Sequence, residues 1–347
     1  MRVLWVVMDA LGADKVTSEL MPNLVALSST GSVSHGIGVL PTTTYPNHAT
    51  FVTGVEPAIH GLYANDVLRA DRWVGAQTVG PDSPTIFDRC RELGLKSVAV
   101  LGDQNLVGVC GAGAATLHWP PGGVLVEGIA CGPTGYAADT ATVDAALELG
   151  VEQFEFAMVH LDENDAVSHI HGPHSEEARA QATASDIALG RLLEVYRPYW
   201  DDTVVIVLSD HSQEDVEPGA AVDMSARLEE VIAPVDPSAR WRCDGTCLVV
   251  APGMHPDVAE AVRGSVGVSG AVGGQQEGLV AWGSDGVLFG LDWGQGGDHG
   301  SIRCRAQVVV VGGGHPDADD LANSAADSVS SASSWYRRTL SLLGAVP

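Results

Sequence analysis

Basic side chains are scarce in this chain. Its 347 residues include 18 Lys and Arg against 44 Asp and Glu, which gives a formal net charge of −26, and lysine occurs only at Lys15 and Lys96. Such a surface repels polyanions, so nucleic-acid polymers and anionic membranes are not expected as partners. A small anionic substrate is compatible with this charge only if the field is reversed locally, which bound divalent cations would do.

Long apolar runs and closely spaced cysteine pairs are also missing. No run approaches the roughly 20 apolar residues that span a bilayer. The short run 3–8 ends at Asp9 and lacks the longer apolar region and cleavage site of a secretory signal, so we expect a cytoplasmic protein. The six cysteines show no CxxC spacing and are expected to be free thiols. The sequence does not predict an oligomeric state.

Short β-branched runs bounded by turn residues predict the strands of a sheet. These runs are 3–8, 97–101, 154–161, 203–208, 247–251 and 307–311. Helical patterns lie between many of them, at 84–93, 139–149 and 175–196, with Ser83 as the expected cap of the first. Strands that alternate with helices predict an α/β fold with a mostly parallel central sheet and helices on both faces.

The length of the chain and one change in its pattern predict an insertion. A chain of 347 residues exceeds the roughly 250–300 residues at which single cores stop growing. Segment 212–298 is rich in glycine and in short strand-like pieces such as 278–282 and 286–291. We therefore expect a catalytic core formed by 1–211 and 299–347, and a small α+β lid formed by 212–298. Residues 312–334 are expected to be a polar connection before a closing helix at 335–343.

Five separated segments carry residues suited to chemistry. They are Asp9, TTTYPNHATFVTG at 42–54, DENDAVSHIHGP at 162–173, LSDH at 208–211 and GDHG at 297–300. Three of them directly follow predicted strands, and the carboxyl ends of parallel strands share one edge of a sheet. Carboxylates mixed with imidazoles suit zinc or a similar ion. Each residue alone has a plainer explanation as a turn, cap or surface ion pair, and their coincidence favours a metal site.

Thr44 is placed to act as a nucleophile. Pro46 suits the first turn of a helix that runs to about residue 53, so Thr44 would lie at its N-terminus, where free N–H groups favour an alkoxide and a phosphate. Threonine is a weak nucleophile at its free pKa, and metal coordination is its natural activator. Thr42 and Thr43 compete for the role, and a plain helix cap is the alternative. His48 is expected to pack within the helix.

The segment TYPNHATFVTG, followed by HGLYAND at 60–66, resembles the alkaline phosphatase superfamily and specifically its nucleotide pyrophosphatase/phosphodiesterase branch. The resemblance extends from Asp9 to His299. It implies an alkaline phosphatase-like fold and two divalent metal ions, with zinc the first expectation and manganese the alternative. It implies that one ion is held by Asp165, His169 and His299. It implies that the other is held by Asp9, Thr44, Asp210 and His211.

The resemblance also implies a reaction. Thr44 would attack phosphorus and form a phospho-threonine intermediate, and Asn47 would bind the non-bridging oxygens. On the substrate side, Tyr45 could stack on a flat group, and His160 stands where nucleotide-specific members often carry an aromatic residue. The absence of Lys and Arg from 42–54 favours a small phosphodiester or pyrophosphate substrate. A monoesterase or phosphonate hydrolase on the same metals is the alternative, and a non-catalytic metal-binding protein is the alternative from another class.

Overall fold

The computed structural model describes residues 1–28 and 33–345, apart from the side chains of residues 225 and 226. The strands of its main sheet are Arg2–Met8 (β1), Ser34–Ile37 (β2), Ser97–Leu101 (β5), Leu117–Trp119 (β6), Phe156–Leu161 (β7), Thr203–Leu208 (β8), Ala306–Gly313 (β15) and Ser330–Ser331 (β16). Their order across the sheet is β16–β2–β15–β8–β1–β7–β5–β6. The run from β8 to β6 is parallel, and β15 pairs antiparallel with both of its neighbours.

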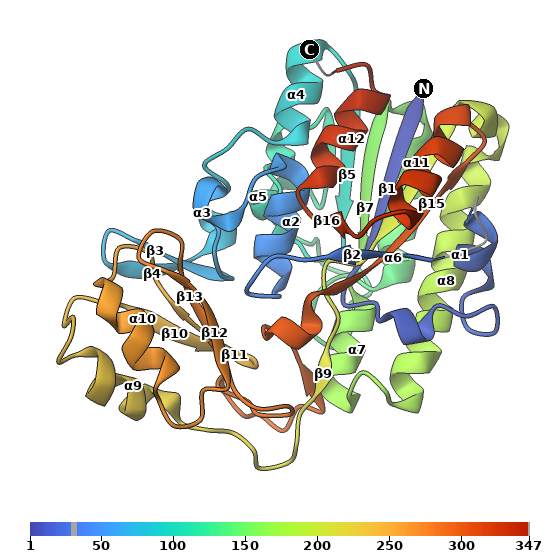
Figure 1. Ribbon diagram of the computed structural model, residues 1–347. Helices are drawn as coiled ribbons and strands as arrows, with labels where there is room; N and C mark the ends of the chain where they lie inside the picture. The colour runs from blue at the N-terminus through green and yellow to red at the C-terminus, as the bar shows by residue number, and fades with distance from the viewer. Residues whose placement is uncertain (29–32, 346–347) are drawn as a thin grey trace.

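Helices cover both faces of this sheet (Figure 1). The helices of the core are Pro22–Leu27 (α1), Thr44–Thr53 (α2), Pro57–His60 (α3), Ile86–Leu93 (α4), Leu106–Val109 (α5), Asp139–Leu149 (α6), Glu163–His171 (α7), Glu176–Tyr196 (α8), Pro316–Ala326 (α11) and Ser334–Leu342 (α12). Alternate side chains of β1 enter two different apolar clusters. Trp5 packs with residues of α2, α4 and α12, whereas Leu4 packs with residues of α1, α6 and α8. Burial on both faces explains why the strands are continuously apolar.

The predicted α/β fold with a mostly parallel sheet is confirmed. Two local expectations for the core were wrong. The predicted polar connection 312–334 contains helix α11, which begins at Pro316 behind the capping side chain of His315 and buries three alanines on one side. The helix predicted from residue 84 begins at Ile86, because Thr85 and Asp88 form a reciprocal capping box in place of a Ser83 cap. No described helix has both the length and the apolar character needed to cross a membrane.

Segment 212–298 carries a second sheet with its own apolar cluster. Its strands are Trp241–Asp244 (β10), Cys247–Val250 (β11), Gly270–Gly274 (β12) and Gly278–Trp282 (β13), in the order β10–β11–β13–β12, and all neighbours are antiparallel. Helices Met224–Ile232 (α9) and Pro256–Arg263 (α10) pack on one face of it. The expected strand at 286–291 is not formed, since those residues lie in a loop.

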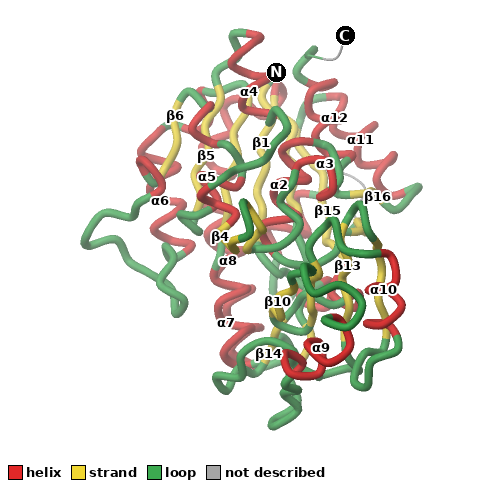
Figure 2. The backbone as a smooth tube through the Cα atoms, turned by 90° about the vertical axis from the view of Figure 1, so that its left-hand side faces the viewer, coloured by secondary structure: helices red, strands yellow, loops and turns green. Residues whose placement is uncertain are grey.

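This inserted unit lies beside one end of the core, at the lower left in Figure 1 and the lower right in Figure 2. The two short strands Glu214–Asp215 (β9) and Gly297–Asp298 (β14) pair antiparallel where the chain leaves and re-enters the core. A hairpin of Asp66–Arg69 (β3) and Arg72–Gly75 (β4) extends from the core toward it, and Arg242 of the inserted unit forms an ion pair with Asp66 at 2.8 Å. The inserted unit is thus joined to the core through the β9–β14 pair and through the ion pair with the β3–β4 hairpin.

Candidate active site

The carboxyl ends of three neighbouring strands deliver the acidic residues of the site. Asp9 follows β1, Asp210 follows β8, and Asp165 lies on the first turn of α7 just beyond β7. Since β8, β1 and β7 are adjacent and parallel, residues up to 201 positions apart meet at one edge of the sheet. His169 lies four residues after Asp165 on α7, which places the two side chains one turn apart on the same face.

The first cluster gathers around the Nε2 atom of His211. That atom lies 3.3 Å from Thr44 Oγ1, 3.5 Å from Asp9 Oδ1 and 3.2 Å from Asp210 Oδ2. The other oxygen of Asp210 is fixed by the backbone N–H groups of Ala10 and His211, at 3.1 and 3.0 Å. The structure therefore brings together the four residues that the resemblance assigns to one ion.

The second cluster gathers around the carboxylate of Asp165. Its Oδ2 lies 3.3 Å from Nε2 of His169, and its Oδ1 lies 3.6 Å from Nε2 of His299. The His299 ring stacks on that of His211, with 4.1 Å between the ring centroids, so the two clusters adjoin. The structure therefore also brings together the three residues that the resemblance assigns to the other ion.

The backbone orients all three of these histidines in the same way. His169 Nδ1 lies 3.1 Å from the carbonyl oxygen of Gly297, His211 Nδ1 lies 3.1 Å from that of Ser212, and His299 Nδ1 lies 3.0 Å from that of Thr42. A carbonyl oxygen only accepts, so each Nδ1 carries the proton and donates it. Each Nε2 is the nitrogen that faces the carboxylates, and in the neutral ring its lone pair can bind a metal.

The donor set fits divalent cations. Asp9 Oδ1 and Asp210 Oδ2 are buried and have no hydrogen-bond partner among the described residues. Burial and the neighbouring carboxylate of Asp210 raise the pKa of Asp9 well above its ordinary value, and burial likewise raises the pKa of Asp210. Closely spaced carboxylates in a buried place are unfavourable unless a cation lies between them. Oxygen and imidazole ligands together suit zinc or manganese more than calcium.

Without an ion, Asp165 and His169 behave as an ion pair. Burial opposes ionisation of both groups, but the attraction between them outweighs it. The pKa of Asp165 is held well below its usual range, and the pKa of His169 is raised to about 10. A metal ion at this cluster would have to displace the His169 proton, so binding there releases a proton.

Thr44 is the first residue of α2, as the sequence predicts, and Thr43 is the cap residue before it. Asn47 is fully buried. Its Oδ1 accepts from the N–H of Val39 at 2.9 Å, and its Nδ2 donates to the Thr43 carbonyl oxygen at 3.0 Å. In this structure Asn47 holds the chain at the start of α2, and its contact with a phosphoryl oxygen stays a prediction.

Asn65 is a site residue that the sequence analysis missed. Its Oδ1 accepts from the N–H of Tyr45 at 3.2 Å, which places its side chain beside the peptide that follows Thr44. Its amide NH2 has no hydrogen-bond partner within the described ranges, and the side chain is half-buried. The signal was available, because Asn65 lies within the motif HGLYAND.

Tyr45 lines the core side of the site. Its hydroxyl accepts from Asn105 Nδ2 at 2.9 Å, and burial together with the negative charge of Asp103 raises its pKa. Only 8% of the residue is exposed, so its role in stacking on a substrate stays a prediction.

The predicted substrate contact of His160 is not seen. His160 is a central residue of β7 with no exposed surface, and its Nε2 lies 2.9 Å from Asp9 Oδ2. It therefore faces a predicted metal ligand from beneath the site. His48, expected to pack within α2, does pack edge-on against Phe51, but its Nδ1 also lies 3.5 Å from Asp210 Oδ2.

The competing residues of the 162–173 motif lie away from the two clusters. His171 is exposed, and His174 forms surface ion pairs with Asp14 and Asp215. Asp162 accepts from Thr134 Oγ1, and Glu163 accepts from the N–H of Asp139. The structure thus favours Asp165 and His169 within this motif, as the resemblance does.

Two further contacts support the clusters and were not predicted from the sequence. Gln213 Nε2 donates to Asp165 Oδ1 at 2.6 Å, which orients that carboxylate. The turn between β10 and β11 of the inserted unit lies against His299, whose carbonyl oxygen accepts from the N–H of Thr246 at 2.9 Å. Burial raises the pKa of Asp244 in the same turn to about 6, and Asp298 adds to this effect. The inserted unit therefore reaches the site through this turn.

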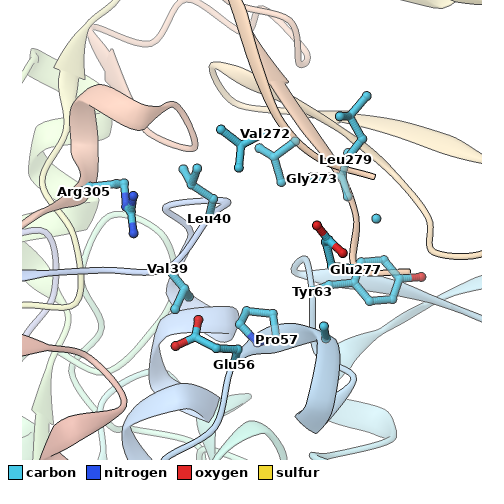
Figure 3. Close-up of a pocket in the computed structure, with 14 residues that line it drawn as sticks. Val39, Leu40, Glu56, Pro57, Tyr63, Val272, Gly273, Glu277, Leu279 and Arg305 are labelled. Carbon is cyan, nitrogen blue, oxygen red and sulfur yellow. The ribbon is translucent and has the colours of Figure 1, made fainter. Parts of the chain in front are cut away.

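A separate cavity of about 300 Å³ lies between the core and the face of the second sheet (Figure 3). Val39, Leu40 and Pro57 line it from the core, and Val272 and Leu279 line it from the inserted unit. It contains none of the predicted metal ligands. The chemistry is therefore expected at the strand ends and not in this cavity.

Comparison with known proteins shows the family of the chain. Residues 3–265 match the family described as type I phosphodiesterase / nucleotide pyrophosphatase. A venom phosphodiesterase from Macrovipera lebetinus is 28% identical over 213 residues, covering 57% of this chain and 23% of that protein. An uncharacterized pyrophosphatase/phosphodiesterase from Schizosaccharomyces pombe is 28% identical over 225 residues, covering 60% of this chain and 44% of that protein. The chain thus spans less than half the length of these relatives.

Solved structures show the same fold. Murine ectonucleotide pyrophosphatase/phosphodiesterase 5, in an inactive form bound to AMP, superposes with a TM-score of 0.71 at 16% identity, covering 100% of this chain and 96% of that one. Phosphonoacetate hydrolase from Sinorhizobium meliloti, bound to phosphonoformate, gives a TM-score of 0.70 at 16% identity, covering 99% and 96% of the two chains.

The fold is that of the alkaline phosphatase superfamily. Within it, the chain belongs to the type I phosphodiesterase / nucleotide pyrophosphatase family, whose members are hydrolases of phosphoric ester bonds and use two divalent metal ions.

Proposed function

We propose that this chain is a phosphodiesterase or nucleotide pyrophosphatase-type hydrolase that acts on a small phosphodiester or pyrophosphate through a phospho-threonine intermediate. One observation carries the proposal. Thr44 Oγ1, at the N-terminus of α2, lies 3.3 Å from Nε2 of His211, and two buried carboxylate oxygens that have no hydrogen-bond partner among the described residues converge on the same nitrogen. A hydroxyl in that setting is the one group of the site suited to attack phosphorus.

We assign the metal ligands as the resemblance implies. One ion would be held by Asp165, His169 and His299. The other would be held by Asp9, Thr44, Asp210 and His211. Zinc is the ion we propose, because three imidazoles present Nε2 to the carboxylates, and manganese is the alternative. Two such ions would lower the pKa of the Thr44 hydroxyl and neutralise the charge of the phosphoryl group.

The proposed reaction consists of two displacements at phosphorus. Thr44 Oγ forms a bond to phosphorus while the bond to the leaving oxygen breaks, and the hydroxyl proton of Thr44 leaves with that oxygen as an alcohol. Water then attacks phosphorus, which frees Thr44 and releases a phosphate monoester. The free N–H groups at the start of α2 and the amide NH2 of Asn65 would bind the non-bridging oxygens.

A diester is favoured over a monoester by charge. The hydrogen bonds and ion pairs of the seven proposed ligands involve no Lys or Arg among the described residues. A monoester carries one more negative charge than a diester and needs more positive groups to bind. The fold shared with phosphonoacetate hydrolase keeps a phosphonate hydrolase as the second candidate.

A cytoplasmic location is also a proposal, which cell fractionation would test.

A substrate panel tests this function. The zinc-loaded and manganese-loaded protein should hydrolyse an aryl phosphodiester faster than the matching monoester and phosphonate, and chelation should abolish all three activities. Hydrolysis of the phosphonate alone would show a phosphonate hydrolase, and hydrolysis of the monoester alone would show a monoesterase. Failure to hydrolyse any of the three in the presence of bound metal would contradict an esterase function on such substrates.

A further inference from the structure

His160 occupies an unusual position for a histidine beside a metal site. It lies on the central strand β7, has no exposed surface and is directly beneath Asp9, with 2.9 Å between Nε2 and Asp9 Oδ2. Its other nitrogen, Nδ1, accepts a hydrogen bond from the backbone N–H of Asp103 at 3.4 Å. Both ring nitrogens therefore have a partner inside the core, and the ring has no route to a substrate.

These partners fix the tautomer of His160. An N–H group only donates, so His160 Nδ1 must be unprotonated, and the single proton of the neutral ring is on Nε2. His211 and His299 show the opposite arrangement, because their Nδ1 atoms face carbonyl oxygens and their Nε2 atoms are left bare. The backbone thus makes those two histidines into metal-binding groups and makes His160 into a hydrogen-bond donor.

We propose that His160 is a positioning residue, which donates from Nε2 to Asp9 Oδ2 and so holds Asp9 Oδ1 toward the metal site. Asp9 Oδ1 lies 3.5 Å from His211 Nε2 and has no other partner among the described residues. A neutral donor fixes the carboxylate without cancelling its charge, which a lysine or arginine would do. Hydrogen-bond partners of ligands commonly contribute about 10–100-fold to metal affinity. This inference rests on the proposed metal site.

The alternative is that His160 is itself a ligand. Asp9, His48 and His160 each offer an atom within 4.8 Å of the others, so they are also a candidate metal group. The hydrogen bond from Asp103 argues against this role, because it leaves the proton on the nitrogen that faces Asp9. In that tautomer His160 Nε2 has no lone pair to offer.

The test compares metal affinity in three variants. His160→Leu removes the donor, and His160→Met is a second replacement without a donor in case the first fails to fold. His160→Gln keeps an amide donor near the position of Nε2. The matched control is His60→Leu, because His60 is also fully buried, also accepts from a backbone N–H at Nδ1, and also lies near a partner at Nε2, but that partner is Thr50.

Zinc is titrated against a chelating indicator, with the zinc content per chain measured on the same samples. Wild type should bind two ions. The donorless variants should bind one of them about 10–100-fold more weakly and regain turnover when zinc is raised by the same factor. His160→Gln should lie closer to wild type than to the leucine variant, and His60→Leu should lose stability while keeping wild-type zinc affinity.

The outcomes separate this inference from the proposed function. Wild-type zinc affinity in both donorless variants would overturn the inference and leave the function standing, and so would a changed KM for substrate with unchanged zinc affinity. Three ions in wild type and two in His160→Leu would show that His160 is a ligand and would also overturn it. A wild-type protein that binds no zinc or manganese would overturn the proposed function itself.

Discussion

At the scale of single residues, the three proposed metal-binding histidines differ from His60 and His160 in the backbone group that faces Nδ1. His169, His211 and His299 donate Nδ1–H to carbonyl oxygens and present Nε2 to carboxylates, whereas His60 and His160 accept at Nδ1 from backbone N–H groups. The sequence supplies the residue type and its spacing, but not the neighbouring backbone group that selects the tautomer. This is why the sequence analysis placed His160 on the substrate side.

The two asparagines beside Thr44 make a prediction at this scale. The amide NH2 of Asn65 has no hydrogen-bond partner in the part of the chain that the structure describes, whereas both ends of the Asn47 amide are bound to backbone groups. Asn65→Ala should lower kcat by about 10²–10³-fold, the usual loss when one donor to a developing charge is removed, and should leave metal content unchanged. Asn47→Ala should mainly lower stability. A larger kcat loss in a well-folded Asn47→Ala than in Asn65→Ala would restore the role that the sequence predicted for Asn47.

At the scale of elements, the turn Asp244–Thr246 joins the inserted unit to the metal site. Gly245 has a φ of +52°, and a Cβ there would overlap the carbonyl oxygen of His299 and the carboxylate of Asp298. The same turn donates from Thr246 N–H to His299. Elsewhere in the inserted unit, Val272 and Gly273 of β12 line the separate cavity and do not reach the metal ligands.

Gly245→Ala should therefore disturb His299 from a distance in sequence of more than 50 residues. We expect a loss of zinc affinity of at least about tenfold, by analogy with other changes to the surroundings of a ligand. The control is Gly253→Ala, because Gly253 also has a positive φ, of +95°, but has open space around its Cβ position. Both variants should lose about 1–3 kcal/mol from backbone strain. Equal zinc affinities in the two variants would show that the turn does not support the site.

The end of helix α3 makes the fold sensitive to acid. Burial lowers the pKa of His60 to about 4, below the roughly 6.5 of an unfolded chain. The unfolded state therefore binds more protons between these values, so the free energy of unfolding is highest above about pH 6.5 and falls as pH drops toward 4. From pH 7 to pH 5 the loss from His60 alone should be about 2 kcal/mol.

Urea unfolding of wild type and His60→Gln at the two pH values measures this loss. Other buried histidines contribute equally to both proteins, so the difference isolates His60. Wild type should lose more stability than the variant on acidification. Parallel pH dependence in the two proteins would show that His60 is not held neutral by the fold.

At the scale of the whole molecule, the sequence predicts the fold and the two clusters because both depend on strong local patterns. The continuous apolar runs predicted β5 and β8 with the bounds that the structure shows. The position of Asp9 and Asp210 directly after predicted strands indicated that they belong to the site. The strands β2 and β6 were missed because they are short, and in β2 buried and exposed residues alternate. Helix α11 was missed because its buried side chains are alanines within a polar segment. Gln213 was missed because only a tertiary contact brings it to Asp165, whereas Asn65 was missed although it lies within the motif HGLYAND.

Metal removal should destabilise the entire fold. Chelation leaves Asp9, Asp165 and Asp210 together in a buried place with no cation between them. A ligand at 100 times its Kd stabilises by about 2.7 kcal/mol, which corresponds to a Tm change of about 4 °C per bound ion for a protein of this size. Zinc should restore the Tm, whereas calcium, which prefers all-oxygen sites, should not. An identical Tm with and without chelator would contradict a buried metal centre.

The central claim is that Thr44 attacks phosphorus at a metal site. The most direct test measures turnover of an aryl phosphodiester and metal content in zinc-loaded Thr44→Ala, beside Thr44→Ser and Thr43→Ala. Thr43 is the matched control, because its buried hydroxyl has no hydrogen-bond partner among the described residues. We predict a loss of turnover of at least about a thousandfold in Thr44→Ala with metal retained, measurable activity in Thr44→Ser and a mild effect in Thr43→Ala. Near-wild-type turnover in metal-loaded Thr44→Ala would show that water attacks directly and would contradict the account.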